Sequence, residues 1–151
     1  MQRQLKFRAW DKLEKRFFYP DKGYQGHYVL TLNGQFQNLQ NGSGGNEYVV
    51  QQWTGLKDKS GKEIYEGDIL KVKITDEVIP TNNGRKINAC VRWDNFHAHW
   101  IVESKIEKDM LDGEQYPFGC NENCYIDYHS PVTVDAKIIG NVFENSELLK
   151  Q

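Results

Sequence analysis

Alternating apolar and polar residues run through most of the chain, and this period of two predicts β-strands rather than helices. The pattern is clearest where Leu70, Val72 and Ile74 share one face and Lys71 and Lys73 share the other. Gly, Asn, Asp or Pro residues follow most of these short segments and favour tight turns. The strands expected from the pattern cover residues 6–11, 17–19, 26–32, 48–56, 64–65, 69–79, 89–93, 96–102 and 132–143.

Residues 89–102 predict a hairpin with a two-residue turn at Asp94 and Asn95. This turn would pair Trp93 with Phe96 and bring the apolar faces of the two strands together. The residues expected on the resulting buried face are Val91, Trp93, Phe96, Ala98 and Trp100.

Helical periodicity is scarce. Residues 104–112 are the best internal helix candidate, and an irregular stretch follows over 113–131. A short terminal helix is expected to begin at Asn145 or Ser146, since both are suitable N-cap residues. Residues 40–46, rich in Gly, Asn and Ser, predict a flexible loop.

The predicted fold class is therefore mainly β. We expect an N-terminal β segment over residues 1–56 and a small β-barrel over residues 57–151, with a helix and loop insertion at 104–131 and a short C-terminal helix. A closed barrel is favoured because closure leaves no strand edge of a short-stranded sheet exposed.

Composition bounds the class of protein further. The 151 residues can bury a substantial core, and 4 Trp, 8 Tyr and 7 Phe argue against a disordered chain. No apolar run approaches the length of a transmembrane helix, and no apolar stretch follows the first charged residues. The three Cys residues, an odd number, suit a reducing compartment. We expect a cytoplasmic protein with no secretory signal and no membrane partner.

Charge is distributed unevenly along the chain. Residues 1–22 hold seven Lys and Arg against three Asp and Glu, a net charge of +4, whereas residues 103–151 hold four against ten, a net charge of -6. Complementary ends predict a homo-oligomer, and docking of the two ends within one chain is the alternative. The overall net charge of -2 argues against a generic nucleic-acid-coating protein.

Cys and His residues are the candidates for a metal site, since thiolates and imidazoles are good zinc ligands. Cys120 and Cys124 have Cys-x3-Cys spacing with His129 five residues later, and the predicted hairpin puts Cys90 across from His99. No second Cys pair completes the pattern. We therefore expect no metal, no other cofactor and no catalytic residue.

Nucleic-acid binding is an alternative interpretation, because small barrels with exposed aromatic residues can stack bases. The basic residues that would follow a phosphate backbone are Arg3, Lys6, Arg8, Lys12, Lys15 and Arg16. The acidic balance of the whole chain favours a solvated strand face instead.

Three segments resemble the YopX family of phage and prophage proteins: residues 6–11 (KFRAWD), 52–69 (QWTGLKDKSGKEIYEGDI) and 138–149 (IIGNVFENSELL). They occur in the family's order and span nearly the whole chain. Trp53 stands where Tyr is common, and Ser146 stands where Pro is frequent. The region 104–131 is longer than expected, so no role is carried over to it.

The repeated motif residues make sense as turns and packing. Four glycines suit tight turns or close backbone approach, namely Gly55, Gly61, Gly67 and Gly140. Four aromatic residues suit a core or a seam, namely Trp10, Trp53, Tyr65 and Phe143.

The resemblance implies a phage-encoded accessory protein whose C-terminal part is a small Src-homology-3-like barrel, with no assigned catalytic residues. We expect a phage or prophage accessory protein, not an enzyme, that acts as a non-catalytic protein-interaction module in the cytoplasm of a bacterial host cell. Its partner would be a host or phage protein that the sequence does not identify. A nucleic-acid-binding barrel is the alternative, and a metal-dependent enzyme is the third interpretation.

Overall fold

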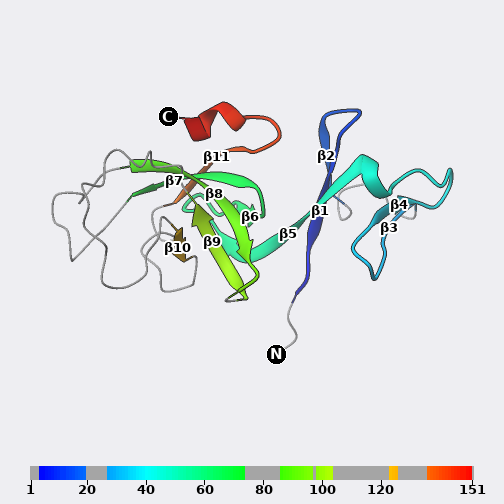
Figure 1. Ribbon diagram of the computed structural model, residues 1–151, viewed down its shortest axis with the longest axis horizontal. Coiled ribbons are helices and arrows are strands. Elements are labelled where there is room, and N and C mark those ends of the chain that lie inside the picture. Colours follow the sequence, from blue (N-terminus) through cyan, green and yellow to red (C-terminus); the bar gives the residue numbers. More distant parts are fainter. Residues whose placement is uncertain are drawn as a thin grey trace. The chain divides into compact units, whose positions relative to one another are not determined.

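The computed structural model describes residues 4–19, 27–73, 86–96, 98–103 and 136–150, and the backbone of 123–125. The chain divides into two compact units, Met1–Gly55 and Leu56–Gln151 (Figure 1). Regular structure in the described residues is β-strand apart from two short 3-10 helices, so the mainly-β prediction is confirmed. No helix in this part of the chain is long and apolar enough to cross a membrane.

Antiparallel strands form the first unit. β1 (Phe7–Asp11) pairs with β2 (Arg16–Phe18) on one side and with β5 (Tyr48–Lys57) on the other. The turn between β1 and β2 is held by Asp11, whose Oδ1 accepts the backbone N–H groups of Leu13 and Glu14 at 2.8 and 2.9 Å. β5 continues into the second unit, where β6 (Glu63–Tyr65) completes the strand order β2-β1-β5-β6.

A separate hairpin of β3 (Tyr28–Leu30) and β4 (Phe36–Asn38) belongs to the same unit. β4 was not predicted, because Phe36 is its only large apolar residue. The segment that follows was expected to be a flexible loop, but it forms a hydrogen-bonded turn. The Asn38 N–H donates to the Ser43 carbonyl at 2.7 Å, and the Gly42 N–H donates to the Asn38 carbonyl at 3.0 Å. A short 3-10 helix, η1 (Gly45–Glu47), then leads into β5.

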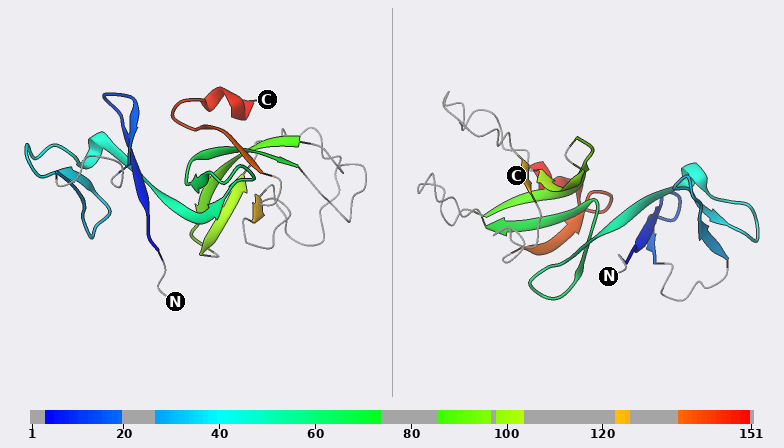
Figure 2. Two further views of the ribbon diagram at one scale, coloured as in Figure 1. Left: turned by 180° about the vertical axis from the view of Figure 1, so that it is seen from behind. Right: turned by 90° about the horizontal axis from the view of Figure 1, so that it is seen from below.

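The second unit contains a five-stranded antiparallel sheet in the order β10-β9-β8-β7-β11, which curls in both views of Figure 2. Its strands are β7 (Asp68–Lys73), β8 (Lys86–Asp94), β9 (His99–Glu103), β10 (Asn123–Tyr125) and β11 (Lys137–Asn141). β10 lies in a stretch predicted to be irregular. The expected terminal helix is a 3-10 helix, η4 (Ser146–Lys150).

The curled sheet of the second unit is a half-barrel. Its outer strands β10 and β11 are not paired with each other in the part of the chain that the structure describes. The closed Src-homology-3-like barrel therefore stays a prediction. The internal helix expected at 104–112 lies outside the described residues.

The core of the second unit lies on the apolar face that the alternation predicted. Leu70 and Val72 of β7 are fully buried, while Lys71 between them is exposed. The buried residues that pack together on this face are Ile64, Leu70, Val72, Ala89, Val91, Trp100, Val102 and Ala136.

The predicted register of the β8–β9 hairpin is wrong. Trp93 pairs with Trp100 and Asp94 pairs with His99, so the turn after Asp94 holds four residues rather than two. The Asp94 carboxylate accepts the Phe96 N–H at 2.9 Å. Phe96 is 88% exposed, Ala98 is exposed in the turn, and Trp93 is 38% exposed, so the predicted buried face is wrong at these three residues. Because the register shift is an even number of residues, the apolar faces still coincide, and Val91 and Trp100 are buried.

Candidate functional site

The central motif, residues 52–69, builds a buried hydrogen-bond network. The Asp58 Oδ1 accepts the backbone N–H groups of Ser60 and Lys62 at 2.8 and 3.0 Å, and Oδ2 accepts that of Ile138 at 3.1 Å. Burial raises the pKa of Asp58, but the Ser60 hydroxyl and these backbone donors outweigh burial and hold the pKa below its usual value. Both carboxylate oxygens of Asp58 therefore serve as acceptors for backbone N–H groups, which is a structural role.

A second buried carboxylate, Asp68, joins the central motif to the C-terminal one. Its Oδ2 accepts the Tyr65 N–H at 2.8 Å, and the Asn141 side-chain amide donates to its Oδ1 at 3.3 Å. Next to Asn141, a Cβ added at Gly140 would lie 2.6 Å from the Asn145 Oδ1, so the backbone approach predicted here is confirmed. These contacts give Asp68, Gly140 and Asn141 a structural role in holding the two motifs together.

The four aromatic residues of the motifs differ in how much of each side chain is exposed to solvent. Trp10 and Tyr65 are buried, as expected of core residues, and Trp53 is half-buried. Phe143 is 38% exposed, so it does not belong to the core.

The candidate site lies in the first unit, where the β3–β4 hairpin packs on one face of the β1–β5 sheet. Tyr28 and Phe36 of the hairpin stack with ring centroids 5.1 Å apart, and Phe36 meets Tyr48 edge-on at 5.2 Å. Ala9 is fully buried beneath this cluster. Burial, together with a hydrogen bond to Tyr28, raises the pKa of Tyr48, so its hydroxyl stays neutral at physiological pH.

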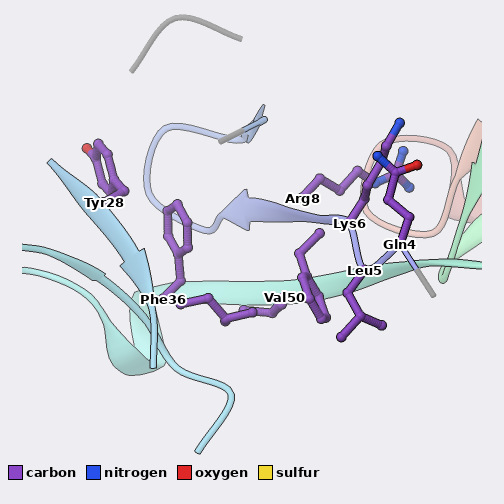
Figure 3. Close-up of a pocket in the computed structure, with 9 residues that line it drawn as sticks. Gln4, Leu5, Lys6, Arg8, Tyr28, Phe36 and Val50 are labelled. Atoms are coloured by element: carbon purple, nitrogen blue, oxygen red, sulfur yellow. The ribbon is translucent and has the colours of Figure 1, made fainter. Parts of the chain in front are cut away.

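A pocket of about 500 Å³ opens where this apolar face continues past the aromatic cluster. Tyr28, Phe36, Val50 and Leu5 follow one another across the pocket in Figure 3. Leu5 is 58% exposed, so apolar surface remains open to solvent at its end. The residues that line the pocket are Gln4, Leu5, Lys6, Phe7, Arg8, Tyr28, Leu30, Phe36 and Val50.

Positive charge gathers at one end of the pocket, where Gln4, Lys6 and Arg8 lie together (Figure 3). The Arg8 Nε donates to the Gln51 Oε1 at 2.8 Å, and its guanidinium carbon lies 4.3 Å from the Phe17 ring centroid. The Lys6 ammonium lies 4.8 Å from the Trp53 ring centroid. None of the nine lining residues is acidic, so the pocket combines an apolar floor with a cationic end.

Of the other basic residues named for nucleic-acid binding, Lys12, Lys15 and Arg16 do not line this pocket. The Lys12 ammonium donates to the Asn46 carbonyl at 2.7 Å, and Arg16 pairs with Glu14 and lies over the Phe18 ring. Lys15 occupies the β1–β2 turn. Arg3 lies outside the described residues.

The metal candidates are also separated from one another where they can be placed. Cys90 is buried, its pKa is raised by that burial, and its strand partner is Glu103 rather than the predicted His99. His99 instead faces Asp94, with 3.9 Å between Nε2 and Oδ2. In the described part of the chain, no three His, Cys, Asp or Glu residues gather as metal ligands would. Of the remaining candidates, Cys124 is described only as backbone in β10, and Cys120 and His129 fall outside the described ranges.

Sequence reasoning missed the pocket because it missed β4 and therefore the hairpin that forms one wall. A signal was present, since Asn33 and Gly34 predict a tight turn after the expected strand at 26–32. A tight turn requires a returning strand. A two-residue turn there would pair Phe36 with Thr31, one residue from the observed pairing of Phe36 with Leu30.

Comparisons with known proteins identify the same family as the three sequence motifs. The family model described as YopX protein matches residues 6–150. Among solved structures, EF1440 from Enterococcus faecalis is 24% identical with a TM-score of 0.54, covering 97% of this chain and 98% of its own. YopX from Bacillus subtilis is 18% identical with a TM-score of 0.57, covering 95% of this chain and 97% of its own. These two likenesses show the fold.

No curated protein matches the sequence. The family match covers all three motifs on which the sequence resemblance rests, and it extends across both units of the structure. The chain belongs to the YopX family.

Proposed function

We propose that the protein is a non-catalytic interaction module, acting as a phage or prophage accessory protein in a bacterial cell, and that it binds an extended segment of a partner protein in the pocket of the first unit. The observation that carries the proposal is the open apolar face beside β1, with basic residues at one end and no acidic residue among the described lining residues. A volume of about 500 Å³ lies within the usual range of ligand sites.

The shape of the pocket favours an extended segment. Five consecutive residues, Gln4 to Arg8, line it, and a strand of that length runs roughly 16 Å. About five residues of an extended peptide would match this length. Leu5, Phe7 and Val50 would contact its apolar side chains, while the Lys6 ammonium would attract a carboxylate near one end.

Selection from a random heptapeptide display library tests the proposal without knowledge of the natural partner. The wild-type protein should enrich peptides that combine aliphatic or aromatic residues with Asp or Glu. Leu5→Glu removes apolar contact and opposes an acidic peptide, so it should weaken the selected peptides by about tenfold or more.

Leu13→Glu is the matched control, because Leu13 is 75% exposed in the β1–β2 turn and does not line the pocket. It should leave the affinity of the selected peptides unchanged. Failure of the wild type to enrich any sequence would overturn the proposal, as would equal binding by Leu5→Glu.

A further inference from the structure

Five lysines from four separate stretches of sequence surround a small hollow of about 130 Å³ in the second unit. We call this set the lysine cluster. Among the residues that the structure describes, only Val72 lines the hollow with them, and none of these lining residues is acidic or aromatic. The members of the lysine cluster are Lys59, Lys71, Lys73, Lys86 and Lys137.

The strand register places these like charges directly opposite one another. Lys71 of β7 pairs with Lys137 of β11, and Lys73 of β7 pairs with Lys86 of β8. The Lys59 N–H donates to the Ala136 carbonyl at 3.1 Å, which brings the fifth lysine beside Lys137. Figure 2 shows β11, β7 and β8 side by side, so the lysines cross three strands as one diagonal stripe.

Such an arrangement opposes folding, because like charges directly across a strand pair repel each other. In the part of the chain that the structure describes, none of the four strand lysines of the cluster forms an ion pair, whereas Arg16 and Arg92 each pair with a glutamate. The chain carries a net charge of -2, so an overall excess of lysine does not account for the stripe. A bound anion would remove the repulsion.

We infer that the lysine cluster binds the phosphate backbone of a nucleic acid without reading its sequence. Two strand spacings and two residues along β7 give the stripe a length of roughly 12 Å, which exceeds a single phosphate ion and suits a chain of phosphates. None of the described lining residues is aromatic, so these lysines would position a phosphate backbone and would not stack on bases. This site is independent of the peptide pocket and differs from the N-terminal basic segment considered from the sequence.

Fluorescence anisotropy with labelled 20-nucleotide random-sequence DNA, as single strand and as duplex, tests the inference on the full chain. The wild type should bind both with similar affinity for unrelated sequences and lose affinity steeply with salt. Lys71→Gln with Lys137→Gln should weaken duplex binding between ten- and a hundredfold at about 0.1 M salt, and reduce the slope of log K against log salt by about 1.8.

The matched control is Lys57→Gln with Lys150→Gln, which removes the same charge at two exposed positions outside the cluster. This control should keep the wild-type affinity to within about threefold, because neither lysine belongs to the stripe. Leu5→Glu should also bind DNA as the wild type does, which separates this site from the peptide pocket.

Folding gives a second readout. Loss of Lys71 and Lys137 relieves a repulsion, so the double variant should unfold at a denaturant midpoint no lower than that of the wild type. If the Lys71 and Lys137 double variant fails to fold, Lys73→Gln with Lys86→Gln applies the same binding test to the other lysine pair. Absence of wild-type binding at 50 mM salt, equal loss in the control, or unchanged binding in both cluster variants would overturn the inference.

Discussion

Asp58 and Ile138 lie 80 residues apart in the sequence, yet the Asp58 carboxylate accepts the Ile138 backbone N–H at 3.1 Å. The same carboxylate accepts the N–H groups of Ser60 and Lys62, so one buried side chain closes the turn before β6 and anchors β11 to it. Local turn chemistry and long-range strand placement therefore depend on the same two oxygens.

We expect Asp58→Asn to destabilise the second unit by about 1.5–3 kcal/mol, the usual worth of hydrogen bonds to a charged group. The amide retains one acceptor oxygen but turns its NH₂ group toward a backbone donor. Urea unfolding followed by circular dichroism measures the loss. Glu144→Gln, at an exposed residue, is the control and should change the free energy of unfolding by less than about 0.5 kcal/mol. A wild-type midpoint for Asp58→Asn would contradict this account.

The lowered pKa of Asp58 predicts a pH dependence of a definite sign. A carboxyl group whose pKa is lower in the folded than in the unfolded state stabilises the fold above the unfolded value and loses that contribution as pH falls through the folded value. Stability should thus decline as pH drops below about 4, the usual range of an Asp carboxyl. Asp58→Asn should decline less between pH 6 and pH 3. An equal decline in both proteins would assign the acid sensitivity to other carboxylates.

Gly140→Ala should destabilise the second unit by about 1–3 kcal/mol through overpacking. The added methyl group would lie 2.6 Å from the Asn145 Oδ1 and 2.9 Å from its Cβ. A double-mutant cycle with Asn145→Gly isolates this clash, because Gly140→Ala should cost much less once the Asn145 side chain is gone. Additive effects of the two changes would place the strain elsewhere.

The two tryptophans paired across β8 and β9 should differ in their contribution to stability. Their rings meet edge-on with centroids 5.0 Å apart, but Trp100 is 7% exposed and Trp93 is 38% exposed. Trp100→Ala should cost about 3–5 kcal/mol, as large-to-small core changes do. Trp93→Ala should cost about 1 kcal/mol. Unfolding monitored by far-ultraviolet circular dichroism compares them, and equal costs would contradict the observed burial.

Sequence periodicity was sufficient for the core of the second unit, because burial on a strand repeats every second residue. It placed Leu70 and Val72 correctly and kept Val91 and Trp100 on the buried face despite the wrong register. Periodicity is unchanged by an even shift, so it cannot distinguish a two-residue turn from a four-residue turn. The four-residue turn is stabilised by Asp94, whose carboxylate accepts the Phe96 N–H.

The pocket and the lysine cluster were harder to predict for different reasons. β4 contains one large apolar residue, Phe36, so its burial comes from packing on Ala9 and Tyr48 rather than from any pattern of its own. The lysine cluster gathers residues from distant positions, and each lysine looks like the polar side of an ordinary strand. Only the pairing of β7 with both β8 and β11 brings them together.

The turn after β4 also bears on how this protein can be engineered. Its composition is that of a linker into which a tag or a fluorescent label would ordinarily be inserted. Gly44 pairs with Gln37 at a backbone φ of +145°, and a Cβ there would collide with the Phe36 carbonyl oxygen. An insertion that breaks this pairing would draw Phe36 away from its aromatic neighbours and open one wall of the pocket. A reporter for this chain should therefore not be inserted inside this glycine-rich turn.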